Sequence, residues 1–180
     1  MKKLLFLILC FPFTAFSQSY NFIQQTSGNS TSIRGMSIVS DEVAWVSGSN
    51  GTVGRTIDGG LNWQWIKPEG YEKLDFRDIE AFDSNKAIVV NAGSPAYILL
   101  TNDGGKSWTQ TYKNTDSAIF LDGMDFWDEK QGIIFGDPIE NRMQLLKTSD
   151  GGLSWKDISA NLKRNMLSGE AGFAASGTTI

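Results

Sequence analysis

Short apolar runs separated by polar turns recur along the whole chain, and helical periodicity is weak throughout. Three of the runs are continuous stretches of apolar and β-branched residues, a pattern typical of strands that are buried on both faces. They lie at 43–46, 87–90 and 132–135. A shorter segment precedes each run and another follows it, so we predict strands at 34–38, 77–81 and 122–126 and at 52–55, 97–100 and 143–147.

An octapeptide follows each group of strands. Its three copies share T-x-D-G-G-x-[S/N]-W and begin at Thr56, Thr101 and Thr148, so they are spaced by 45 and 47 residues. The Asp supplies a carboxylate for backbone N–H groups of its own turn, and the two Gly tolerate positive φ. The octapeptide therefore predicts a tight hairpin, after which the Trp folds back as a buried plug between repeats.

With a further strand after each Trp, every repeat of about 46 residues holds four strands, the size of one β-propeller blade. We therefore predict an all-β propeller of four-stranded blades, here about three and a half of them. Closed propellers have about four to eight blades, so we expect the N-terminal part of a longer chain. The alternatives are an arc that closes by dimerising and an open fragment. The predicted divisions are 1–17, a signal peptide; 20–64, blade 1 with a preceding strand; 65–109, blade 2; 110–156, blade 3; and 157–180, a linker and the start of blade 4.

The N-terminus has the pattern of an export signal. Two lysines precede the apolar stretch 4–16, and Ala15 and Ser17 are the small residues expected before a cut at Gln18. The stretch is too short for a membrane span, so we expect a periplasmic or secreted protein without a span in the mature chain. A lipoprotein that uses Cys10 is the alternative. We also expect that 20–24 forms the strand that completes the last blade of a closed ring.

Composition excludes much chemistry. The chain has no His, and its single cysteine, Cys10, lies in the expected signal, so a Ser-His-Asp triad, a His-ligated zinc site and a disulfide framework are excluded for the mature chain. We expect no metal and no cofactor. A net charge of −4 without a cluster of basic residues argues against nucleic-acid binding.

The octapeptide resembles the Asp-box, or bacterial neuraminidase repeat, of sialidases and related propellers. The longer pattern over residues 32–176 resembles the photosystem II stability and assembly factor family of seven-bladed propellers, which implies a chaperone-like scaffold. In these families the box lies on the rim away from the ligand, which implies a structural role for its residues. These are Asp58, Gly59, Gly60, Trp63, Asp103, Gly104, Gly105, Trp108, Asp150, Gly151, Gly152 and Trp155. Asn62 stands where Ser or Thr is usual, so the resemblance leaves open whether the first box makes the usual hydrogen bonds.

Function is expected on the first strand of each blade, because these strands line the channel of a propeller. The equivalent positions there are Arg34, Arg77, Asp122 and Ala171. The resemblance implies an arginine-lined face for a partner polypeptide; Arg34 and Arg77 match it, whereas the other two positions do not. The first three are the predicted partner-binding residues. Local pairing of each Arg with a neighbour such as Asp75, Asp78 or Asp122 is the alternative.

We therefore predict an exported, non-catalytic binding or assembly module with a protein partner; a glycan is a further possible ligand. The alternative is a sialidase-like glycoside hydrolase. Such an enzyme needs three substrate-binding Arg, a Tyr nucleophile with a Glu and an acid Asp, and no pair of carboxylates here is singled out by spacing. Two loops, 65–71 and 136–142, are additional candidates for partner contact.

Overall fold

The chain forms three four-stranded antiparallel sheets. The computed structural model describes residue 23 and residues 29–172, and the expected signal peptide and most of 20–24 lie outside them. Within each sheet the strands are hydrogen-bonded in chain order, which is the order of a propeller blade. The strands are β1 (Ile33–Ile38), β2 (Ala44–Gly48), β3 (Thr52–Thr56) and β4 (Gln64–Ile66) in blade 1, β5 (Phe76–Ala81), β6 (Ala87–Asn91), β7 (Ala96–Thr101) and β8 (Thr109–Asn114) in blade 2, and β9 (Leu121–Phe126), β10 (Gly132–Ile139), β11 (Arg142–Thr148) and β12 (Lys156–Asp157) in blade 3.

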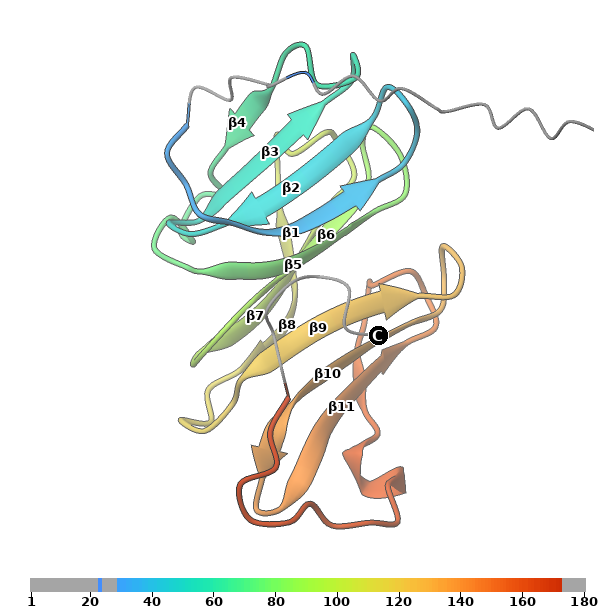
Figure 1. Cartoon of the computed structure of the whole chain (residues 1–180). Helices are drawn as coiled ribbons and strands as arrows, with labels where there is room; N and C mark the ends of the chain where they lie inside the picture. Colours follow the sequence, from blue (N-terminus) through green and yellow to red (C-terminus); the bar gives the residue numbers. More distant parts are fainter. Residues whose placement is uncertain (1–22, 24–28, 173–180) are drawn as a thin grey trace, which may run out of the picture.

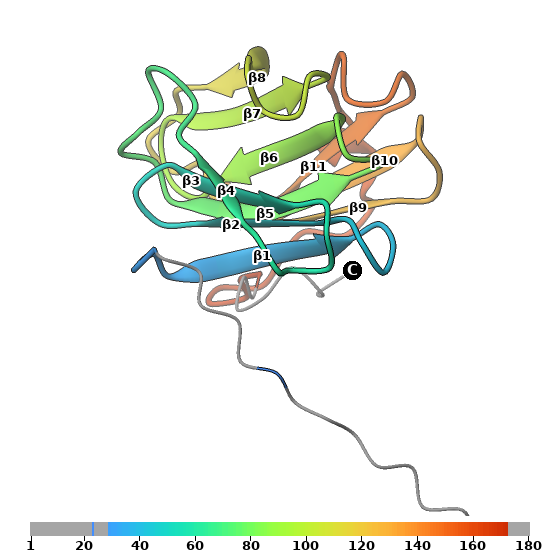
Figure 2. The same ribbon diagram turned by 90° about the horizontal axis from the view of Figure 1, so that it is seen from above.

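The blades follow one another along the chain and pack face to face (Figure 1). Their first strands lie next to each other, because β1 contacts β5 and β5 contacts β9. The view in Figure 2 places these three strands along one side of the molecule, with β7, β8 and β11 farther away.

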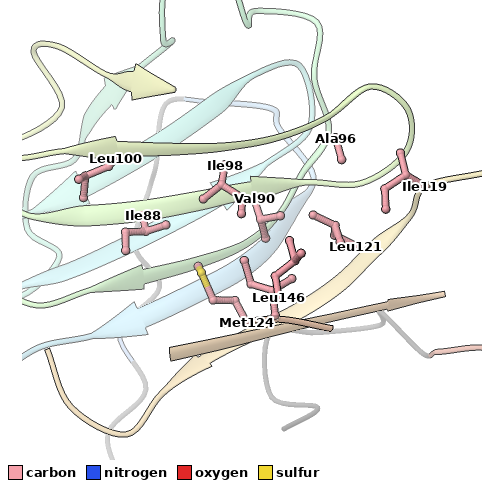
Figure 3. Close-up of a cluster of buried hydrophobic side chains, with 10 residues drawn as sticks. Ile88, Val90, Ala96, Ile98, Leu100, Ile119, Leu121, Met124 and Leu146 are labelled. Carbon is pink, nitrogen blue, oxygen red and sulfur yellow. The ribbon is translucent and has the colours of Figure 1, made fainter. Parts of the chain in front are cut away.

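Two apolar clusters hold the blades together. Trp45 and Val53 of blade 1 pack against Phe76, Ile79 and Leu99 of blade 2. The second cluster joins blades 2 and 3, and Figure 3 shows side chains of β6 and β7 directed at those of β9 and β11. Every residue of β6 is buried, because this strand is the second strand of the central blade and has a neighbour on both faces. Burial on both faces explains the continuous apolar run at 87–90.

The third blade departs from one expectation. The segment 136–142 was expected to be a mixed-charge loop, but β10 extends to Ile139 and β11 begins at Arg142. Glu140 and Asn141 both have positive φ, 52° and 63°, so two residues suffice to reverse the chain and the strands pair up to the turn. In the same way, β4 includes Trp65 and Ile66, and the connector after it is 67–75.

The sheet ends differ slightly from the predicted divisions. The divisions after residues 64, 109 and 156 each fall inside the fourth strand of a blade. After β12 the chain forms one 3-10 turn, Ser159–Asn161, and Ala171 and Gly172 are not in a strand. Residues 173–180, where the rest of a fourth blade was predicted, lie outside the described residues. Between residues 29 and 172 no helix is long and apolar enough to cross a membrane.

Candidate functional site at the start of the first strands

The three octapeptides form the same hydrogen-bonded turn. In the second copy the buried Thr101 hydroxyl donates to Asp103 Oδ1 at 2.9 Å and accepts from Gly105 N at 3.0 Å. Ser107 donates its side-chain hydroxyl to Asp103 Oδ2 at 2.6 Å and its N–H to Oδ1 at 2.9 Å. These bonds, the Ser107 hydroxyl first, lower the pKa of Asp103 to about 2. All six glycines of the boxes have positive φ, which confirms the predicted turn geometry.

Asn62 replaces the serine without loss of hydrogen bonds. Its N–H donates to Asp58 Oδ1 at 2.9 Å and its Nδ2 donates to Oδ2 at 2.8 Å. Ser154 makes the equivalent pair of bonds to Asp150 at 3.0 and 2.6 Å. The pKa of Asp58 and that of Asp150 are lowered by these bonds. The doubt that the sequence raised about the first box is therefore removed.

Each box is tied to the first hairpin of its own blade. Gly59 N donates to the carbonyl of Glu42, Gly104 N to that of Asn85 and Gly151 N to that of Lys130, each at 2.9 Å. The boxes therefore lie at the end of the blades where the first strands finish. Because the carboxylates accept bonds within their own turn, they are poor candidates for acid or base chemistry.

The tryptophans of the boxes pack in two ways. Trp108 lies against the apolar cluster between blades 1 and 2, and Trp155 lies against the cluster between blades 2 and 3. These two contacts are the predicted packing between repeats. Trp63 instead stacks on Trp65 of its own blade, with ring centroids 5.9 Å apart.

The opposite end of the first strands carries the predicted partner-binding residues. Ile33 pairs with Gly48 and Gly35 pairs with Ser47, so Arg34 is the extra residue of a β-bulge. Arg77 is the extra residue between Phe76 and Asp78 in β5, and Asp122 is the extra residue between Leu121 and Gly123 in β9. A bulge changes the direction of a side chain, and bulges are frequent beside functional sites. The structure thus gives the three equivalent positions one shared backbone irregularity.

The two arginines have acidic or aromatic neighbours. Arg34 Nε lies 4.0 Å from Asp75 Oδ1, and both side chains are partly exposed. The guanidinium of Arg77 lies 5.5 Å from the centre of the Phe120 ring and lowers the pKa of Asp122. The local pairing that the sequence left as an alternative is therefore present in part. At 4.0 Å the first pair is wider than a direct hydrogen bond.

Asp122 is buried at this end of β9. Burial and, less strongly, the charge of Asp137 raise its pKa and Arg77 opposes both, with a net pKa of about 6. Gly172 N donates to Asp137 Oδ1 at 2.8 Å, and a Cβ on Gly172 would collide with Asp122 Oδ2. Ala171, the fourth predicted position, is exposed beside this contact. Here the chain after β12 returns to the first strand of blade 3.

A second acidic group lies farther along the first strands. Asp78 is buried and accepts from Met124 N of blade 3 at 2.8 Å, which links two blades. Burial raises the pKa of Asp78 to about 6 and that of Glu80 to about 7, with Asp125 raising both. Ser37 Oγ accepts from Ala81 N at 3.0 Å and so links β1 to β5. These links depend on which strands become neighbours, so the sequence pattern did not reveal them.

Among residues 29–172 no three acidic residues converge as ligands for a metal ion. The arrangement can recognise a ligand through two guanidinium groups, an aromatic ring and neighbouring carboxylates. Sequence reasoning named Asp75 as a possible partner of the arginines, but it did not find Phe120 beside Arg77 or Asp137 beside Asp122. Phe120 directly precedes β9, so its place beside the first strand of blade 3 was the available signal.

Comparisons with known proteins agree with this architecture. The model of the family described as "Photosynthesis system II assembly factor YCF48" matches residues 16–116. A curated relative from Synechococcus sp. (strain CC9902), named "Photosystem II assembly lipoprotein Ycf48", is 29% identical over 110 residues, which are 61% of this chain and 31% of that protein.

Two solved structures share the fold. "YCF48 bound to D1 peptide" has a TM-score of 0.57 and 24% identity, and the match covers 75% of this chain and 42% of that one. "YCF48 from Cyanidioschyzon merolae" has a TM-score of 0.55 and 21% identity, with 78% and 45% covered. The chain therefore spans less than half the length of these three relatives.

Proposed function

Because the chain belongs to the photosystem II assembly factor YCF48 family, we propose that it is a non-catalytic scaffold that binds a partner polypeptide during assembly of a protein complex. The face that binds the partner is the end of the first strands that carries Arg34, Arg77 and Asp122. One solved relative is "YCF48 bound to D1 peptide", so a polypeptide is the ligand class with a precedent in the fold.

The observation that supports this proposal best is the shared β-bulge. In each blade the extra residue occupies the same place on the first strand, and its identity changes from Arg to Arg to Asp. A bulge that served the fold alone would not need a charged side chain. Arg34 and Arg77 are partly exposed on adjacent strands, where a ligand can span them, and Asp122 is buried beside Arg77.

The pairing of the arginines leaves them able to bind. Arg34 and Asp75 are 4.0 Å apart and partly exposed, and such an exposed pair contributes about 0–1 kcal/mol to stability. A partner that offers carboxylate or carbonyl oxygens to Arg34 therefore displaces little interaction energy. Asp75 and Asp122 disfavour a partner that offers no negative or polar group to pair with the arginines in their place.

We also propose that the protein is exported, with cleavage between Ser17 and Gln18. The curated relative is named a lipoprotein, which fits export, and the N-terminal pattern supports it. The N-terminal sequence of the protein isolated from its native cells tests this: Gln18 as first residue is expected, and an intact Met1 would contradict export.

Site-specific photo-crosslinking tests the binding face. A photoreactive residue replaces Ser117, which is exposed on the connector before β9, and a control replaces the exposed Lys106 in the second box. In native cells we expect one dominant crosslinked protein from position 117 only. Its loss in the variant with Arg34→Glu and Arg77→Glu is the second expected result. Equal crosslinking from both positions, or an unchanged product in the double variant, would overturn the proposed face.

A titration with a labelled D1 peptide then tests the partner class. Saturable binding that weakens by about a hundredfold in the same double variant is expected, because two charges are reversed. Thermal unfolding of the variant controls for folding. Absence of D1 binding together with a crosslinked protein of another kind would retain the scaffold and reject D1 as its partner.

A further inference from the structure

Each arginine at a bulge of the first strands lies next to one residue of the following blade. Arg34 Nε is 4.0 Å from Asp75 Oδ1, and Asp75 comes two residues before Arg77, the next bulge residue. The guanidinium of Arg77 is 5.5 Å from the centre of the Phe120 ring, and Phe120 comes two residues before Asp122. The same place of the repeat therefore faces an arginine at both junctions between blades.

The backbone around this place is the same at both junctions. Ala92 N donates to the carbonyl of Asp75 at 2.9 Å. Asp137 N donates to the carbonyl of Phe120, also at 2.9 Å. Because the backbone repeats, the two junctions differ in the side chain that faces the arginine, which is a carboxylate at the first junction and an aromatic ring at the second.

At the first junction Asp75 places an acceptor beside Arg34. The two side chains are each 38% exposed, so a partner reaches both groups. Arg34 Nε and Asp75 Oδ1 make no hydrogen bond to any of the described residues. A backbone amide offers an oxygen to the guanidinium and an N–H to the carboxylate, whereas a second carboxylate is repelled by Asp75. The first junction therefore suits an uncharged polar group.

At the second junction an aromatic ring replaces this carboxylate. A ring attracts the flat face of a guanidinium without neutralising its charge, and the N–H groups of the guanidinium point outward in its plane. The acid beside this pair is Asp122, which is buried. Burial and, less strongly, Asp137 raise the pKa of Asp122 to about 6 against the opposing charge of Arg77. Below pH 6 most Asp122 side chains are therefore uncharged and do not offset the charge of Arg77.

We propose that the side chain facing each arginine determines which group of the partner that arginine binds. Phe120 orients Arg77 for a carboxylate. Asp75 directs Arg34 to an uncharged polar group such as a backbone amide. The bound segment thus places an acidic side chain at the junction of blades 2 and 3 and its backbone at the junction of blades 1 and 2. This inference rests on the proposed partner binding and adds the chemistry of the bound segment.

An NMR titration of the full chain with isotope-labelled arginine tests the two preferences separately. The Nε–Hε signals are assigned from Arg34→Lys and Arg77→Lys. The probes are two acetylated and amidated peptides, Gly-Ser-Glu-Ser-Gly and Gly-Ser-Gln-Ser-Gly. They are compared at about pH 5.5, where the Glu peptide is mostly ionised and Asp122 is mostly neutral.

The Arg77 signal should show saturable binding of the Glu peptide below about 20 mM, at least about fivefold tighter than binding of the Gln peptide. The Arg34 signal should not distinguish the two peptides. An Arg77 signal that responds equally to both peptides or to neither, or an Arg34 signal that prefers the Glu peptide, would overturn the proposal.

Two substitutions of Phe120 separate the ring from its apolar volume. Phe120→Leu keeps an apolar side chain and removes the ring, so it should weaken binding of the Glu peptide at Arg77 by about three- to fivefold. Phe120→Tyr keeps the ring and should bind within about twofold of the original chain. Equal affinities of the two variants would contradict the assigned role of the ring.

Asp75→Asn removes the negative charge beside Arg34. The Arg34 signal should then prefer the Glu peptide by about threefold or more. Asp41→Asn is the matched control, because it removes the same charge from an exposed side chain after the opposite end of β1, and it should create no preference. An Asp75→Asn variant that behaves like the control would contradict the role of Asp75. Circular dichroism verifies that each variant folds.

Crosslinking from position 117 separates a failure of this inference from a failure of the proposed scaffold. A dominant crosslinked protein, without a preference of Arg77 for the Glu peptide, would retain the scaffold and reject the chemistry assigned to the two junctions. The preference without any dominant crosslinked protein would support the carboxylate site and reject the scaffold.

Discussion

The two ends of the first strands differ in how faithfully they repeat. At one end the three Asp-boxes make the same bonds in every blade, even where Asn62 replaces Ser. At the other end the same bulge carries Arg34, Arg77 and then Asp122. An interaction that every blade needs has to repeat, whereas a surface that recognises one asymmetric partner cannot. The comparison supports our proposal that the first end stabilises the fold and that the second end recognises the partner.

The largest expected effect is the change of stability with pH. The buried acids along the first strands and the carboxylates of the Asp-boxes change stability in opposite directions. Asp78, Glu80 and Asp122 have folded-state pKa values raised to about 6, 7 and 6. The folded state therefore binds more protons than the unfolded state between about pH 4 and pH 7, so stability falls as pH rises through this window. We expect a loss of about 3 kcal/mol from pH 5 to pH 8 in urea unfolding, after a discount for partial exposure.

The box carboxylates act in the opposite direction. Their lowered pKa values mean that their contribution is present above about pH 4 and is lost as pH falls through the folded pKa, about 2 for Asp103. Glu80→Gln should flatten the fall between pH 5 and pH 8 while the loss below pH 4 remains. A slope unchanged by Glu80→Gln would contradict the assignment of Glu80 to this window.

Thr101→Val removes the buried hydroxyl at the centre of the second box. It leaves Gly105 N without its acceptor, so we expect about 2 kcal/mol lower stability. Thr111→Val is the matched control, because the hydroxyl of Thr111 makes one long bond of 3.4 Å and is partly exposed. The control should lose less than about 0.5 kcal/mol. Equal losses in chemical denaturation would show that the box bonds have no special role.

Gly105→Ala and Gly70→Ala together measure how much stability is lost by crowding in the box, beyond the loss from backbone strain. Both glycines have φ of +84°, but a Cβ on Gly105 would lie 2.5 Å from Ile66 Cδ1, whereas nothing lies within 4 Å of one on Gly70. Both variants carry the left-handed strain of about 1–2 kcal/mol, and Gly105→Ala should lose about 1 kcal/mol more. Equal unfolding free energies would mean that Ile66 moves away without cost.

Arg77→Gln should have the smallest effect on stability, below about 0.5 kcal/mol at pH 5, because Asp122, the buried acid whose pKa Arg77 opposes, has a pKa of about 6 and is then mostly protonated and uncharged. Differential scanning calorimetry checks this value. A fall in Tm as large as that of Thr101→Val would make Arg77 a structural residue and remove the distinction between the two ends.

Much of this arrangement could be predicted from the sequence. The blade count and most strands follow from the octapeptide and from apolar runs such as 87–90, because a central strand has no polar face. The turn at Glu140 and Asn141 was missed, because neither residue is glycine although both adopt positive φ. The bulges were also missed, since a bulge depends on pairing with the second strand and leaves no separate mark in composition.

The neighbours of the site were predictable only in part. Arg34, Arg77 and Asp122 were found by their equivalent places in the repeat. Asp137 lies near the end of β10. Gly172, whose N–H donates to Asp137, comes from a segment far along the chain. Contacts of this kind arise from packing between strands and blades, for which spacing in one repeat gives no signal.

The most direct test of the account measures stability and partner capture in two variants side by side. With crosslinking from position 117 and thermal unfolding as readouts, Thr101→Val should lose stability and retain capture. The variant with Arg34→Glu and Arg77→Glu should retain stability and lose capture. If both variants lose both properties together, or if the double arginine variant still captures the partner, the division between a structural end and a recognition end is wrong.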